Sequence, residues 1–133
     1  MSIDPAQFTR HPAGQIAVRL LDTAFNERNV RDAFDRYVAP PYTQHNPQVP
    51  DGVAGAVAGL TGFLQSVPNL RYDVKRVLVD GDLVAVHSHV TTGAGDRGTA
   101  AVDIFRIKDG KAVEHWDVLQ PVPETAANEN TMF

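Results

Sequence analysis

The stretch from residue 101 to residue 120, AVDIFRIKDGKAVEHWDVLQ, constrains the fold more than any other part of the chain. Two strand-like runs flank Asp109-Gly110, and an Asp-Gly pair in that setting is a strong signal for a β-hairpin. Because alternate side chains of a strand share a face, His115 and Asp117 lie together on the second strand, and Asp103 lies on one face of the first. A carboxylate on an apolar face is costly to bury alone, so both carboxylates are expected to have a partner or a function.

The sequence leaves the phase of the second strand open. If Asp117 faces the interior, His115 does so too, and Trp116 covers the opposite face or a dimer contact. The alternative phase would turn Glu114 and Trp116 inward. We adopt the first phase, because it aligns Asp103 and Asp117 with a pair of histidines on the preceding strand.

Ahead of the hairpin, the spacing of apolar residues changes from helical to strand-like. Apolar residues recur at three and four positions in three segments, which predicts helices over 14–25, 30–38 and 53–66. From Leu70 the period is two, and turn signals separate four strands at 70–79, 83–92, 98–108 and 111–122. The chain is therefore expected to form one α+β domain over residues 1–133, with three helices covering one face of an antiparallel sheet.

The third helix and the segment before it have an unusual composition. Residues 42–52, YTQHNPQVPDG, predict a structured loop rich in hydrogen-bonding side chains, with Asp51 as the N-cap of the helix. Gly55, Gly59 and Gly62 each weaken the helix by about 0.5–1 kcal/mol relative to Ala. Close packing against a neighbouring segment is expected to compensate.

Composition narrows the classes of partner and site. The 133 residues carry a net charge of −4 without a cluster of Lys and Arg, which argues against nucleic acid or an anionic membrane as the partner. The lack of cysteine excludes disulfides, thiolate catalysis and Cys-based zinc sites. The first residues lack the pattern of a signal peptide, and no apolar run approaches the roughly 20 residues that span a bilayer. We therefore expect a cytoplasmic protein.

Two groups of polar residues add to the carboxylates. His87 and His89, in VHSHV, share one face of a strand and could bind a metal, relay protons or line a polar pocket. We favour pocket lining and expect no metal, because a His-x-His pair is a weak metal signal. In the loop, Tyr42, His45 and Asn46 could contact a ligand or satisfy backbone groups.

These features resemble the NTF2-like superfamily and, within it, the SnoaL-like polyketide cyclase group. The resemblance covers essentially the whole chain and rests on YTQHNP (42–47), VAVHSHV (84–90), AVDIFRIKDGKAVEHWDVLQPVP (101–123) and NTMF (130–133). It implies a curved, cone-shaped sheet whose open end the helices close around an apolar pocket, and a homodimer formed through the outer sheet face. The terminal Met132-Phe133 is expected either to fold back onto the domain or a neighbouring molecule, or to fray.

The resemblance also implies roles for individual residues. In the cyclases, an Asp near the end of the last hairpin acts as acid and base in an intramolecular aldol closure without cofactor or metal, and Asp117 matches that position. Asp103 occupies the place of the assisting residue on the preceding strand, and His89 is a second candidate donor. The expected contacts to a small-molecule ligand are Tyr42, His45, Asn46, Phe63, His87, Phe105 and His115.

Three functions stay open, because this fold serves many chemistries. The first is a cofactor-independent acid/base enzyme, such as an aldol-type cyclase or an isomerase, acting on a small apolar carbonyl compound. The second is a domain that binds a small ligand without chemistry. The third is epoxide hydrolysis, for which related enzymes use an Asp–Arg–Asp arrangement. Arg106 alternates away from Asp103, which counts against the third function.

Overall fold

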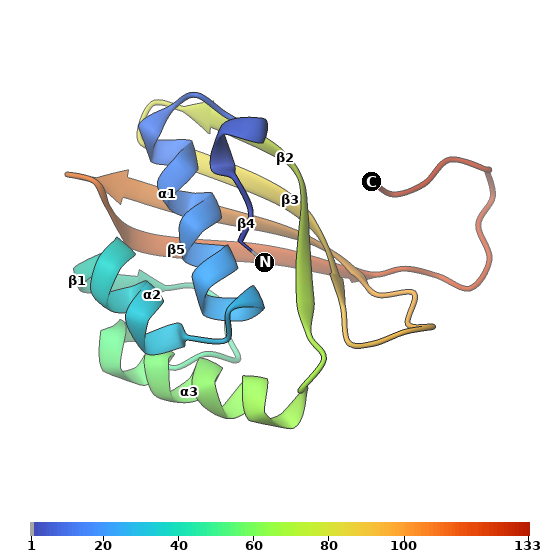
Figure 1. Cartoon of the computed structure of the whole chain (residues 1–133), viewed down its shortest axis with the longest axis horizontal. Coiled ribbons are helices and arrows are strands. Elements are labelled where there is room, and N and C mark those ends of the chain that lie inside the picture. Colours follow the sequence, from blue (N-terminus) through green and yellow to red (C-terminus); the bar gives the residue numbers. More distant parts are fainter. Residues whose placement is uncertain (1) are drawn as a thin grey trace.

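The helices form one layer on the concave face of a curved sheet (Figure 1). Residues 2–133, which the computed structural model describes, form three α-helices and five strands. The helices are α1 (Pro12–Leu21), α2 (Val30–Tyr37) and α3 (Gly52–Ser66), and the strands are β1 (Val38–Gln44), β2 (Arg71–Asp80), β3 (Leu83–Thr91), β4 (Thr99–Lys108) and β5 (Lys111–Pro121). A turn of π-helix over Asp22–Asn26 extends α1. The predicted α+β architecture with three N-terminal helices is confirmed.

The sheet has the strand order β1-β5-β4-β3-β2. Strands β2 to β5 form the predicted antiparallel meander. The sequence pattern does not predict β1, which pairs in parallel with β5, so the sheet is mixed and not purely antiparallel. α2 ends at Tyr37, and Pro40 and Pro41, which lie within β1, lack a backbone N–H for the ladder. The sheet tolerates them because β1 is an edge strand.

Strand alternation and register decide which side chains face the helices. In β3, Val86 and Ser88 are fully buried on the inner face. The register sets Val86 opposite Asp103, and Asp103 opposite Asp117. Residues directly opposite each other share a face. Both carboxylates, and with them His115, therefore lie on the inner face, so the phase adopted for β5 is confirmed.

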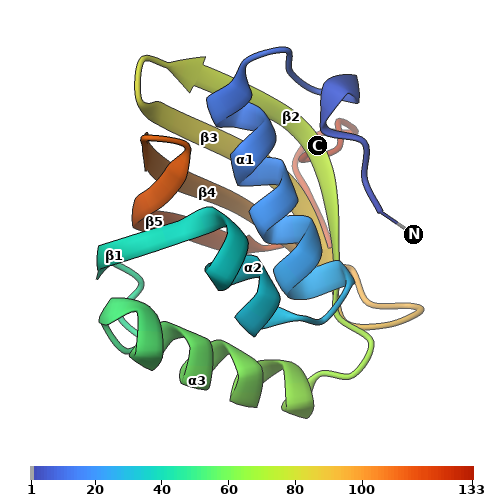
Figure 2. The same ribbon diagram turned by 60° about the vertical axis from the view of Figure 1, so that its left-hand side comes forward.

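α3 lies apart from α1 and beside β1 (Figure 2). The loop that precedes α3 packs closely against this helix. A Cβ atom at Gly55 would lie 2.9 Å from Pro50 Cβ, and one at Gly59 would lie 2.8 Å from Pro50 Cδ. The close packing expected from the glycines is therefore present at these two positions, where the proline ring takes the space of the missing side chains. Gly62 differs, because no atom of the described chain comes within 4 Å of the corresponding position.

The outer face of the sheet carries no helix within residues 2–133. The segment after β5 loops away from the sheet and then returns to it (Figure 1). The Phe133 ring stacks on His89 and His87, with centroid distances of 4.1 and 5.7 Å. Of the two outcomes expected for the last residues, folding back is the one observed. Over the same described range, no helix combines the length and the apolar character needed to cross a membrane.

Candidate active site

A cavity of about 340 Å³ lies between the helices and the inner face of the sheet. A volume of this size suits a small organic molecule. The cavity walls are mainly apolar, and the aliphatic and aromatic side chains that line them are Leu20, Leu21, Ala24, Phe25, Phe34, Val49, Leu60, Phe63, Leu70, Tyr72, Val90, Phe105 and Leu119.

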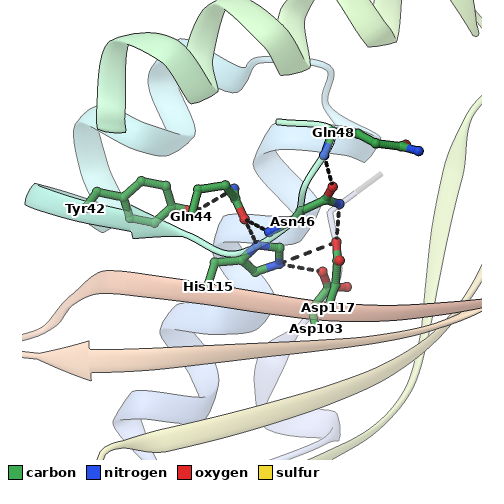
Figure 3. Close-up of polar contacts among 7 residues, drawn as sticks. All are labelled: Tyr42, Gln44, Asn46, Gln48, Asp103, His115 and Asp117. Atoms are coloured by element: carbon green, nitrogen blue, oxygen red, sulfur yellow. Dashed lines mark hydrogen bonds and ion pairs between the residues drawn. The ribbon is translucent and has the colours of Figure 1, made fainter. Parts of the chain in front are cut away.

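Polar side chains gather in one part of this cavity, where β1 meets the final hairpin (Figure 3). They come together because β5 lies between β1 and β4 in the sheet. β1 and the loop after it contribute amide and phenol groups, β4 contributes one carboxylate, and β5 contributes an imidazole and a second carboxylate. The residues are Tyr42, Gln44, Asn46, Gln48, Asp103, His115 and Asp117.

Asp103 and His115 form a buried pair. His115 Nε2 lies 2.8 Å from Asp103 Oδ1, and the two residues are only 8% and 2% exposed. Burial raises the pKa of Asp103, and the hydrogen bond with His115 lowers it by a smaller amount. The nearby carboxylate of Asp117 adds to the increase. Asp103 therefore holds a proton at higher pH than an aspartic acid in water.

β1 supplies the partner of the other imidazole nitrogen. His115 Nδ1 lies 2.7 Å from Gln44 Oε1, and Gln44 Nε2 lies 3.3 Å from Tyr42 Oη. Burial raises the pKa of Tyr42, so this side chain stays a neutral phenol. Asp51 Oδ1 accepts a hydrogen bond from Gln44 N at 2.8 Å. Asp51 does occupy the predicted N-cap position, but its carboxylate bonds to β1 and not to α3.

Asp117 is the second carboxylate of the group. Its Oδ2 atom accepts a hydrogen bond from Asn46 Nδ2 at 2.8 Å and lies 4.0 Å from His115 Nε2. Both carboxylates thus face the same imidazole nitrogen (Figure 3). A carboxyl group with a raised pKa, beside another that accepts a hydrogen bond, is an arrangement suited to proton transfer.

Comparison with known families matches residues 17–115 to the model of the SnoaL-like domain. This chain belongs to the SnoaL-like family. The match includes Asp103 and His115 and ends two residues before Asp117. The resemblance seen in the sequence is therefore confirmed at the level of the family.

Solved structures similar to this SnoaL-like protein cover most of its length. A proposed polyketide cyclase from Acidithiobacillus ferrooxidans is 23% identical, with a TM-score of 0.70 over 90% of this chain and 91% of that chain. A proposed polyketide cyclase from Bacillus cereus is 25% identical, with a TM-score of 0.69 over 90% and 83% of the two chains. A proposed SnoaL-like isomerase from Agrobacterium tumefaciens is 18% identical, with a TM-score of 0.70 over 82% and 97%. A comparison with curated protein sequences finds no significant match.

His87 and His89 of this SnoaL-like protein lie outside the cavity. The prediction that they share a face is right, but the prediction that this face lines the pocket is wrong. Val86 and Ser88 take the inner positions of β3, which turns both histidines to the outer face. His89 Nε2 donates to the backbone oxygen of Arg97 at 2.8 Å. In this position His87 cannot contact a ligand in the cavity and His89 cannot serve as its proton donor.

His45 also lies outside the cavity lining, in contrast to its predicted role. Its ring stacks on Trp116 with a centroid distance of 4.8 Å, and its Nε2 atom lies 2.7 Å from Glu114 Oε2. His45 follows β1 directly and alternates away from the inner face. The other predicted ligand contacts all line the cavity; they are Tyr42, Asn46, Phe63, Phe105 and His115.

The predicted site omits Gln44 and Gln48 of the polar group, and it also omits three polar residues that line the cavity elsewhere, Thr92, Asp96 and Thr99. The signal that could have found Gln44 is the spacing of Tyr42, Gln44 and Asn46, which stand two residues apart as on one face of an extended strand. The prediction of a loop over 42–52 hid this pattern. β1 ends at Gln44 and therefore includes residues 42–44 of the predicted loop.

Asp103, His115 and Asp117 also offer atoms that could bind a metal ion. One ligand atom from each residue lies within 4.8 Å of the other two. A nitrogen with two carboxylate oxygens is a donor set that divalent transition metals accept. The same atoms here bond to one another and to Asn46. The expectation of a metal-free site stays a prediction, which elemental analysis of the purified protein would test.

Proposed function

We propose that this SnoaL-like protein is a cofactor-independent acid/base enzyme that moves a proton on a small apolar carbonyl compound, as in an aldol-type cyclisation or an isomerisation. The observation that carries the proposal is the Asp103–His115 pair beside Asp117 in an otherwise apolar cavity. Water is largely excluded from such a site, so its charges act more strongly than they would in solution.

Asp117 acts as the base in this mechanism. Its carboxylate takes the proton from the carbon next to the substrate carbonyl, and the electron pair of that C–H bond moves onto the carbonyl oxygen as an enolate. Asn46 holds the carboxylate through its 2.8 Å hydrogen bond. In a cyclisation, the enolate carbon then attacks a second carbonyl of the same molecule, and the proton on Asp117 remains available to neutralise the product.

The Asp103–His115 pair acts as the proton donor. It holds a proton near the oxygen on which negative charge develops. Burial raises the pKa of Asp103, so the pair keeps this proton to higher pH than an exposed aspartic acid would. The apolar walls, which include Phe105 and Leu119, bind the rest of the substrate. The Bacillus cereus neighbour, described as a proposed polyketide cyclase, is consistent with a substrate that carries several carbonyl groups.

Asp117→Asn tests the proposal. The variant should lose at least about 100-fold of the proton-transfer rate, because a positioned base contributes roughly 10²–10⁴-fold. The readout is exchange of the α-proton of a cyclic β-diketone for solvent deuterium, followed by NMR. Asp80→Asn, an exposed carboxylate at the end of β2, serves as the matched control. Equal exchange rates in the wild type and in Asp117→Asn would overturn the role of Asp117.

A domain that binds a ligand without chemistry is the second candidate function, and the apolar cavity itself favours it. It predicts that the wild type binds the diketone but does not accelerate its exchange. Epoxide hydrolysis is less well supported, since none of the arginines within residues 2–133 lines the cavity.

We also propose that two copies of the chain associate through the outer face of the sheet. Leu78 and Val118 are 67% and 66% exposed on this face. Val102 and Ile104 of β4 share that face with them, in register with Val118 and Trp116 of β5. Pairing two such faces would bury apolar side chains that a monomer leaves in water.

A further inference from the structure

We propose that Gln44 is a positioning residue that holds His115 with a proton on Nδ1, so that His115 Nε2 and Asp103 share a single proton. This inference rests on the proposed acid/base function and states how its donor is built. It follows from four hydrogen bonds that meet where β1 lies beside β5 (Figure 3).

The first step is the orientation of the Gln44 amide. The backbone N–H of Asn46 lies 3.0 Å from Gln44 Oε1. A backbone N–H can only donate, so the side-chain atom that it faces must be the oxygen of the amide. The amide nitrogen is thereby turned toward Tyr42 Oη, 3.3 Å away. Chain geometry therefore assigns which end of the amide is which.

The second step is the tautomer of His115. Gln44 Oε1 lies 2.7 Å from His115 Nδ1. An amide oxygen can only accept, so the imidazole must donate and Nδ1 must carry a hydrogen. This holds whether the ring is neutral or charged, because both nitrogens carry a hydrogen in the charged form.

The third step is the proton count between His115 and Asp103. Nε2 lies 2.8 Å from Asp103 Oδ1. With the neutral ring protonated on Nδ1, Nε2 has only a lone pair, so a carboxylate there would set two acceptors against each other. One proton must lie between them, either on Asp103, which then donates to Nε2, or on Nε2, which then donates to a carboxylate.

Burial favours the first of these two states. Asp103 Oδ2 is buried and has no hydrogen-bond partner among residues 2–133. The carbonyl oxygen of a neutral carboxylic acid loses less solvation energy there than an oxygen of a carboxylate. Gln44 thus keeps Nδ1 occupied, and the pair can exchange its proton with a substrate only on the side of Nε2 and Asp103.

The test is the ¹⁵N NMR spectrum of the His115 ring without substrate, assigned by comparison with His115→Gln. The wild type should show a hydrogen on Nδ1. Gln44→Leu removes the acceptor, so the hydrogen of the neutral ring should move from Nδ1 to Nε2. Nε2 then donates to Asp103 Oδ1, and the proton of Asp103 moves to Oδ2 or to solvent. Gln44→Glu keeps an acceptor and should retain the hydrogen on Nδ1. Gln120→Leu, an exposed glutamine of β5, should match the wild type.

A wild-type ring whose Nδ1 is bare, or an unchanged tautomer in a folded Gln44→Leu variant, would overturn the inference. If Gln44→Leu does not fold, the wild-type and Gln44→Glu spectra still decide it. The spectrum is recorded without turnover. A correct tautomer in a protein that fails to exchange the diketone proton would therefore reject the proposed function and leave the hydrogen-bond assignment standing.

Discussion

Asp103 is a buried carboxyl group of the cavity, and the shift of its pKa makes stability depend on pH. An aspartic acid in an unfolded chain has a pKa of about 3.9. Burial raises the pKa of Asp103 in the folded protein, so the folded state binds this proton more tightly than the unfolded state does. The stability that the proton contributes is fully present below the unfolded pKa and is lost as the pH rises through the folded pKa.

Asp103→Asn should remove this dependence, because an amide resembles the protonated carboxyl group and does not titrate. As the pH rises from about 4, the free energy of unfolding should shift in favour of the variant, by about 1.4 kcal/mol for each unit by which folding raises the pKa. Urea unfolding of both proteins across a pH series measures the difference. A constant difference across the series would contradict the raised pKa.

Residue patterns predicted the part of the candidate site that lies within one hairpin, β4–β5. The Asp-Gly turn sets the register of β4 against β5, so alternation alone placed Asp103, His115 and Asp117 on one face. The turn between β3 and β4 is longer and leaves that register open. A register shift of one residue turns every side chain of a strand to the opposite face of the sheet. The sequence therefore did not decide the face of His87 and His89, and the predicted face was the wrong one.

At the scale of the element, α3 combines two kinds of glycine. Gly62→Ala should stabilise the protein by about 0.5–1 kcal/mol, because alanine favours the helix and the new methyl group meets no described atom within 4 Å. Gly59→Ala should instead lower the melting temperature, since its Cβ would lie 2.8 Å from the stiff Pro50 ring. Thermal unfolding of the two variants measures both effects. A similar gain in both would show that Pro50 does not restrict the helix.

β1 is the element that sequence patterns did not predict. Its two prolines interrupt the local strand signal, and its partner β5 lies some 70 residues further along the chain. Neither helical spacing nor hairpin chemistry reports a parallel pairing over that distance. Because β1 was not predicted, Gln44 was missed as a site residue, and so was its hydrogen bond with His115.

At the scale of the whole molecule, the outer sheet face tests the proposed association. Val118→Lys should turn a dimer into a monomer, because it places a charge in the apolar interface. Leu119→Lys, its neighbour on the inner face, serves as the matched control for oligomeric state. Light scattering during size-exclusion chromatography reports the mass of each. A monomeric wild type at micromolar concentration, or a dimeric Val118→Lys, would contradict this interface.

The parallel pairing of β1 with β5 also bears on how the protein folds. Hairpins β2–β3, β3–β4 and β4–β5 join neighbouring strands and can close early. The hydrogen bond between Gln44 and His115 spans 71 residues, so it forms only after the two halves of the chain have met. A nascent chain that still lacks β5 also lacks His115 and Asp117, so it cannot assemble the polar group of the cavity.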